Sequence, residues 1–245
     1  NYPYDGPNSG VYSASPDDEL FIHISLAYAD AHPNMESGGF SNGITNGAQW
    51  YSISGGMQDW NYIWEGDCDI TLEQNAVKWP NSSQLAGLWE DHREPMLVYL
   101  EEVHHGVRGI ITDADSGDPL SANISIQGID HDILPDPENG DYYRLLTSGN
   151  YTITAYAFGY LSQSEIVTVP LSGYIEQNFQ LSADPWLAEA DIEDFESGMF
   201  SEFGWEFSGN ATWQADMFEV FEGNYSGISG SISDSEQSAV SIILD

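Results

Sequence analysis

The histidines and the single cysteine are the side chains best suited to metal or nucleophilic chemistry, and their spacing limits what they can do. The six histidines include no H-E-x-x-H and no H-x-x-E pair, so no zinc site can be read from them. His104 and His105 close a predicted helix, where imidazoles favour the negative end of the helix dipole over metal binding. Cys68 lies between Asp67 and Asp69, whose carboxylates raise a thiol pKa rather than lower it. We interpret Cys68 as a packing residue.

Two acidic loops have ordinary explanations. The run from Asp113 to Asp118 is faintly similar to a calcium-binding loop, but it lacks the later glutamate, and a hairpin turn explains it with fewer assumptions. Asp130, His131 and Asp132 are interpreted as a solvated loop. We therefore assign no metal ligand within this chain.

Composition excludes whole classes of function. The chain has 245 residues, 41% of them hydrophobic, and no apolar run near the roughly 18 residues that a membrane span needs. Four basic residues against 40 acidic ones give a net charge of −36, which repels nucleic acid and anionic lipid. The acidity fits either a solvated surface adapted to salty water or a cationic partner. One cysteine excludes an internal disulfide framework.

Residues 1 to about 104 mix helix and strand signals. Ser15 and Pro16 predict a helix start with a capping serine, after which Leu20, Ile24 and Tyr28 share one face. Apolar residues at three- and four-residue spacing predict a second helix over 83–103. Between the two, residues 69–73 predict a buried strand that ends at Glu73.

From about residue 106 the hydrophobic period changes to two. Short runs over 107–112, 122–127, 142–146, 151–157, 166–169 and 175–181 alternate with turn residues, a pattern typical of a small β-sandwich. After an acidic linker, the segment from 193 is rich in aromatic residues and glycine and also predicts strands. At about 55 residues it is short for a sandwich.

One constellation is more specific. Residues 42–51, the run from Gly55 to Tyr62, and Ile70 to Glu73 resemble the zinc metallocarboxypeptidases, most closely their regulatory branch of carboxypeptidase N, E, M and D type. In that family a tyrosine on a mobile loop precedes the catalytic glutamate by 22 positions, as Tyr51 precedes Glu73 here. The resemblance covers residues 1 to about 182.

The resemblance implies a role for each matching residue. Glu73 would be the general base that takes a proton from zinc-bound water, and Tyr51 would close over bound substrate. Asp5 would line the floor of the pocket for the C-terminal side chain, and Gln58 would add a neutral hydrogen-bond acceptor. Together, Asp5 and Gln58 imply removal of C-terminal Arg or Lys from peptides or proteins. Without the family, the alternative for Glu73 is a strand-end glutamate in an ion pair, and Asp5 is better interpreted as an ordinary turn residue near a chain end.

The family's zinc ligands and its substrate-binding arginines are expected upstream of Asn1, so this chain alone is expected to be inactive. The resemblance also implies a domain plan. An α/β segment, the C-terminal part of a carboxypeptidase catalytic domain, spans 1–104, and an all-β transthyretin-like sandwich spans 105–182. A linker over 183–192 then leads to an incomplete jelly-roll-like β domain over 193–245.

Two alternatives from other classes stay open. A non-catalytic pseudoenzyme would keep this part of the fold as a peptide-binding module, and an adhesive β-module protein would bind without zinc chemistry. The absence of cysteine pairs and the appended modules favour a secreted, extracellular or periplasmic bacterial protein.

Overall fold

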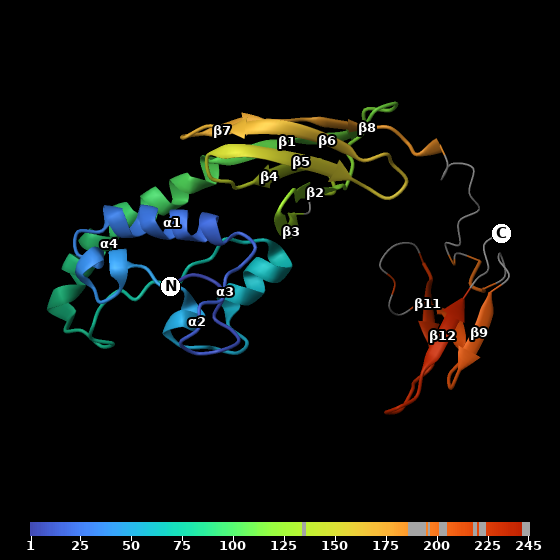
Figure 1. Ribbon diagram of the computed structural model, residues 1–245, viewed down its shortest axis with the longest axis horizontal. Helices are drawn as coiled ribbons and strands as arrows, with labels where there is room; N and C mark the ends of the chain where they lie inside the picture. Colours follow the sequence, from blue (N-terminus) through green and yellow to red (C-terminus); the bar gives the residue numbers. More distant parts are fainter. Residues whose placement is uncertain are drawn as a thin grey trace. The chain divides into compact units, whose positions relative to one another are not determined.

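The structure, a computed structural model, describes residues 1–133, 136–185, 195, 197–200, 205–217, 220 and 224–241. The chain divides into two compact units, Asn1–Asp184 and Pro185–Asp245. In the first unit, helices occupy the N-terminal part and strands follow from residue 106 (Figure 1). The expected order, a helix-containing segment followed by β-structure, is present. The strand expected in the first segment is wrong, because no strand precedes β1 (Gly106–Asp113) among the described residues.

The N-terminal part of the first unit is built on two long helices that pack side by side, α1 and α4 (Figure 1). Its elements, in chain order, are α1 (Asp18–Ala31), η1 (Met35–Ser37), η2 (Ser41–Gly43), α2 (Gly47–Trp50), α3 (Met57–Trp60), η3 (Asn61–Glu65), η4 (Ser82–Gln84), α4 (Leu85–Glu101) and η5 (Glu102–His104). The predicted second helix over 83–103 thus corresponds to α4 with a short turn at each end.

Helix α1 buries the predicted face, since Leu20, Ile24 and Tyr28 are all in the core. The predicted serine cap is wrong. The residue before the helix is Asp17, whose side chain makes no capping bond, and the Ser15 hydroxyl is buried without a partner among the described residues. The Asp17 carboxylate is held elsewhere, by Arg144 and Tyr62.

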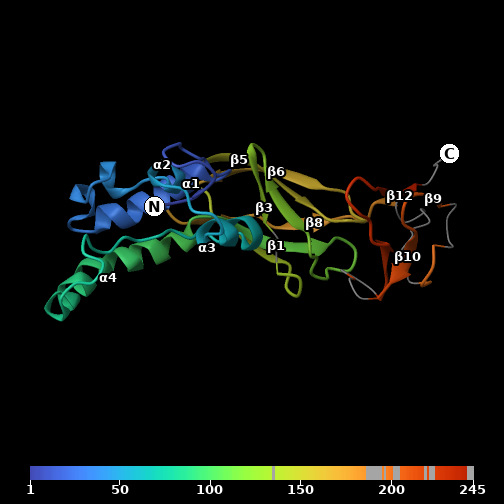
Figure 2. The ribbon, with the colours of Figure 1, turned by 90° about the horizontal axis from the view of Figure 1, so that it is seen from below.

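The strands of the first unit form two sheets. Their bounds are β1 (Gly106–Asp113), β2 (Asn123–Ile126), β3 (Ile129–Ile133), β4 (Asp141–Arg144), β5 (Gly149–Tyr156), β6 (Gln163–Val169), β7 (Tyr174–Glu176) and β8 (Phe179–Leu181). One sheet has the order β4-β1-β7 with β8 also on β1, and the other has the order β3-β2-β5-β6. Figure 2 shows these strands from a second direction.

A single apolar core lies between the two sheets. It includes Ile111 and Phe179 from the first sheet, and Ile124, Ile153 and Val167 from the second. These residues alternate with exposed ones along their strands, as the period of two predicted. The small β-sandwich is therefore present.

The interpretation of residues 130–132 as a solvated loop is wrong. They lie in β3, which pairs antiparallel with β2 through Ile129 and Ile133. Along β3, Asp130 and Asp132 are exposed while His131 between them is partly buried. This is the same alternation as in the other strands, disguised in the sequence by the acidic residues on the outer face.

Among its described residues, the second unit contains two antiparallel pairs of strands. Its strands are β9 (Glu206–Gly209), β10 (Trp213–Asp216), β11 (Ser226–Ser229) and β12 (Ser238–Ser241). Strand β10 pairs with β11, and β9 pairs with β12. Most of the predicted linker over 183–192 lies outside the described residues. None of the described helices is long and apolar enough to cross a membrane.

Candidate functional site

Asp5 is positioned by a short extended segment that runs beside the start of α2. Tyr2 forms a parallel bridge with Asn46, and the backbone N–H of Ala48 donates to the carbonyl of Tyr4 at 2.9 Å. The fully buried Asn46 side chain ties this arrangement together, because it donates to the carbonyls of Pro3 and Ser13, each at 3.0 Å. These contacts hold the segment that carries Asp5 against the start of α2.

The Asp5 carboxylate lies in a cradle of two glycines. A Cβ atom on Gly47 would meet Asp5 Oδ1 at 1.8 Å, and one on Gly56 would lie 3.3 Å from Oδ2. Asp5 is 4% exposed. Burial, reinforced by the nearby charge of Asp59, raises the pKa of Asp5 above its ordinary value. Among the described residues, no lysine or arginine pairs with this carboxylate.

Gln58 contacts Asp5, while its expected part in substrate binding stays a prediction. Its amide nitrogen donates to Asp5 Oδ1 at 3.4 Å, and its amide oxygen accepts a hydrogen bond from the Thr71 hydroxyl at 2.9 Å. Asp59, one residue later on α3, accepts from the Asp5 backbone N–H through both carboxylate oxygens, at 2.9 and 3.0 Å. Thus α3 supplies both the side-chain and the backbone partner of Asp5.

Tyr51 follows α2 directly and is 44% exposed. Its ring packs edge-on against Trp50, with the centroids 4.6 Å apart. No hydrogen bond among the described residues joins Tyr51 to Asp5 or Gln58. Its proposed movement over a substrate stays a prediction.

The predicted buried strand before Glu73 is wrong. Residues 69–73 belong to no helix or strand, and Glu73 itself is exposed. The Thr71 N–H donates to the carbonyl of Asn1, but this segment joins neither sheet, so the backbone lacks the ladder that would define a strand. The catalytic role of Glu73 stays a prediction, now for an exposed carboxylate in an extended segment.

The residues that the structure describes do not supply a zinc site at Glu73. Within the described ranges, one group of His, Cys, Asp or Glu side chains has donor atoms close enough to hold a metal ion: His23, Glu102 and His105. None of Asp5, Tyr51, Gln58 and Glu73 belongs to it. We therefore derive no step of a zinc mechanism from these residues.

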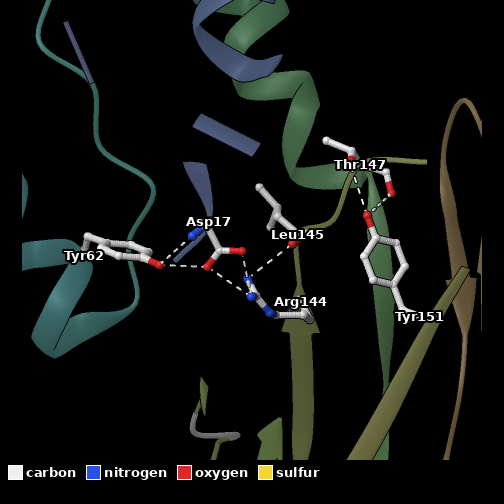
Figure 3. A network of polar contacts seen from close by, with 6 residues as sticks. All are labelled: Asp17, Tyr62, Arg144, Leu145, Thr147 and Tyr151. Carbon is white, nitrogen blue, oxygen red and sulfur yellow. Dashed lines mark hydrogen bonds and ion pairs between the residues drawn. The ribbon is translucent and has the colours of Figure 1, made fainter. Parts of the chain in front are cut away.

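A buried polar network joins the helical part to the sandwich (Figure 3). Arg144 on β4 donates through Nη2 to both carboxylate oxygens of Asp17, at 2.8 and 3.0 Å. The Tyr62 hydroxyl donates to the same carboxylate at 2.9 Å, and its ring stacks on His131 with centroids 4.2 Å apart. Figure 3 shows Asp17 between Tyr62 and Arg144, so one carboxylate connects α1, η3 and β4.

Cys68 behaves as the packing residue that the sequence predicted. Burial raises the pKa of its thiol to about 12, with a smaller contribution from the charge of Asp17. At neutral pH the sulfur therefore stays a protonated thiol, which is a poor nucleophile.

Sequence reasoning found Asp5 and Gln58 but missed the groups that hold them. Asp59, Thr71 and the pair Asn46-Gly47 all lie within the runs that carry the family resemblance, but the resemblance gave none of them a contact with Asp5. The signal for Arg144 was its rarity, since a chain with four basic residues needs a strong reason to bury one of them.

Residues 1–95 match the family described as zinc carboxypeptidase, peptidase M14. This part of the chain is zinc carboxypeptidase sequence. The match includes Asp5, Tyr51, Gln58 and Glu73, and it ends within α4.

Curated relatives extend the similarity into the sandwich. The chain is 45% identical to carboxypeptidase D of Anas platyrhynchos over 175 residues, covering 65% of this chain and 12% of that protein. It is 41% identical to human carboxypeptidase D over 194 residues, covering 74% of this chain and 14% of that protein. It is 42% identical to the carboxypeptidase N catalytic chain of Mus musculus, covering 74% of this chain and 42% of that protein.

These relatives are of the regulatory type that the residue pattern predicted. All three come from vertebrates, so they give no support to the expectation of a bacterial source. The chain spans less than half the length of each of these relatives.

Proposed function

We propose that this chain is part of a metallocarboxypeptidase that releases C-terminal Arg or Lys from peptides or proteins. The observation that carries the proposal is the carboxypeptidase match over residues 1–95, together with the contact between Asp5 and Gln58. Both residues are buried, and they come from segments 53 positions apart. Because both polar side chains are buried, the pair is better placed to bind a polar group of a substrate than to interact with bulk water.

Charge supports the basic preference. Asp5 is a buried carboxylate with a raised pKa, and no lysine or arginine pairs with it in the described part of the chain. A guanidinium or ammonium group would supply that partner and lower the pKa again. The net charge of −36 would also raise the local concentration of cationic substrates.

In this proposal Glu73 handles the proton and Tyr51 covers the bound peptide. Both side chains are exposed, so both are accessible to a substrate. Zinc, when bound by the whole enzyme, would polarise the scissile carbonyl and acidify a water molecule. Its ligands belong to sequence outside these 245 residues.

The remaining parts of the proposal concern organisation. We assign the sandwich to a transthyretin-like domain over 105–182 and the strands after residue 193 to a jelly-roll-like module. We also propose that the protein is exported, since one unpaired cysteine is compatible with an oxidising environment and export brings the enzyme to peptide substrates.

The test uses the longest natural polypeptide that contains these residues, purified with zinc, and peptides that end in Arg, Lys, Leu or Glu. We expect release of Arg and Lys, with loss of activity on chelation. Glu73→Gln is expected to lower kcat by about 10² to 10⁴, the usual contribution of a general base. Glu94→Gln, an equally conservative change at an exposed position on α4, serves as the matched control.

Specificity is tested separately with Asp5→Asn. We expect kcat/KM for Arg-ended peptides to fall about 10- to 100-fold, the value of one hydrogen bond to a charged group, with little change for Leu-ended peptides.

Full activity of the Glu73→Gln variant would refute the assignment of Glu73 as the general base. Peptide binding without any zinc-dependent release would establish the pseudoenzyme instead, and neither binding nor release would favour the adhesive module.

A further inference from the structure

His23, Glu102 and His105 form a cluster that the proposed function does not use. Glu102 Oε2 lies 2.9 Å from His23 Nε2 and 2.7 Å from His105 Nδ1. The two imidazole rings are 6.1 Å apart between centroids. Two imidazoles therefore converge on one carboxylate oxygen.

The fold brings these residues together by two routes. Glu102 and His105 are three positions apart around the 3₁₀ turn η5, and residues at i and i+3 of such a turn lie above one another. His23 comes from α1, which packs against α4 immediately before that turn. The E-x-x-H spacing is visible in the sequence, but the third member is 79 positions away.

We propose that His23 Nε2, Glu102 and His105 Nδ1 form a binding site for one borderline divalent cation of the Zn²⁺ class. Imidazole and carboxylate are the donors that Zn²⁺ prefers, whereas Ca²⁺ and Mg²⁺ prefer sites built from oxygen alone. All donor atoms lie within 4.8 Å of one another. In a tetrahedral site with bonds near 2.1 Å, donors are about 3.4 Å apart.

Reaching that separation requires only small side-chain movements. The side chains of His23 and His105 are 45% and 28% exposed, so their rings have room to rotate. Glu102 is the least exposed member at 12%. Because both imidazoles are partly exposed, solvent water can reach the cluster as a fourth ligand. The site would tie α1 to the turn that leads into β1.

The net charge makes a selective test necessary, because 40 carboxylates will attract any divalent cation weakly. Zn²⁺ binding to the 245-residue chain is therefore measured by calorimetry in a large excess of Ca²⁺, which occupies carboxylate-only sites. We expect one Zn²⁺ per chain. Co²⁺ used as a spectroscopic probe should give visible bands typical of nitrogen and oxygen ligands.

Variants decide which residues bind. His105→Ala, His23→Ala and Glu102→Gln should each weaken Zn²⁺ binding by about tenfold or more, since even outer-shell changes have that effect. His104→Ala is the matched control, because His104 is the exposed neighbour and lies outside the cluster. Circular dichroism and urea midpoints without metal verify that each variant folds.

A second readout reports the site directly. Zn²⁺ should raise the melting temperature of the wild type and of His104→Ala, but not that of His105→Ala, because a ligand that binds only the folded state stabilises it. The proposal is overturned if Zn²⁺ binds no more tightly than Ca²⁺, if His105→Ala or His23→Ala binds like the wild type, or if His104→Ala weakens binding equally.

Discussion

Replacing Arg144 by Met tests the idea that one buried ion pair holds the helical part against the sandwich. The Arg144 and Asp17 side chains are 4% and 1% exposed. In Arg144→Met the Asp17 carboxylate loses both contacts from Nη2, at 2.8 and 3.0 Å, and keeps the Tyr62 hydroxyl as its side-chain donor. Removing one member of a buried pair costs about 3 to 5 kcal/mol, because the remaining charge stays buried.

Urea unfolding followed by circular dichroism measures this cost. With a slope of about 2 kcal/mol per molar urea, the midpoint should fall by about 1.5 to 2.5 M. Arg93→Met is the matched control, since Arg93 pairs with Glu90 on the exposed face of α4 at 3.2 Å. That substitution should cost less than about 1 kcal/mol.

The single variant Asp17→Asn and the double variant Asp17→Asn with Arg144→Met complete a thermodynamic cycle. Since the double variant removes both charges, it should be more stable than Arg144→Met alone. The coupling free energy between the two substitutions then measures the interaction between Asp17 and Arg144. If Arg144→Met shifts the midpoint no more than Arg93→Met does, the pair does not hold the two parts together and the reasoning fails.

Three further predictions concern single positions. Asn46→Ala should lower the free energy of unfolding by about 3 kcal/mol in urea titrations, because the buried carbonyls of Pro3 and Ser13 lose their donor; a loss below 1 kcal/mol would contradict this. Gly47→Ala should cost about 1 to 3 kcal/mol in the same assay, since its Cβ displaces the Asp5 carboxylate, and a wild-type midpoint would show that the cradle can relax freely. Burial lowers the pKa of His131, so as pH falls the unfolded chain binds the proton before the folded chain does, and stability should fall as pH drops below about 6.5. His131→Gln should reduce this dependence of the urea midpoint on pH. An unchanged dependence would exclude His131 as its cause.

The sequence by itself determined the order of structure and the family. Periods of 3.6 and 2 depend only on which local residues are apolar, so α1, α4 and most strands of the sandwich were predictable from runs of a few residues. The family resemblance likewise rests on local runs of residues, and it placed Asp5 and Gln58 in one site before any distance was known. Strand β3 was not predicted, because Asp130 and Asp132 on its outer face make the segment resemble a polar loop and not an alternating strand.

Tertiary structure alone decided which distant groups meet. Asp17 directly follows Ser15 and Pro16 at the predicted helix start, yet its carboxylate binds Arg144, 127 positions later. His23 and Glu102 meet because α1 packs on α4, and Glu73 is exposed because its segment joins neither sheet. Such contacts depend on how whole elements pack, and packing buries surface without regard to separation along the chain. A local pattern can therefore name a residue's type of chemistry, while its partner is fixed only when the elements assemble.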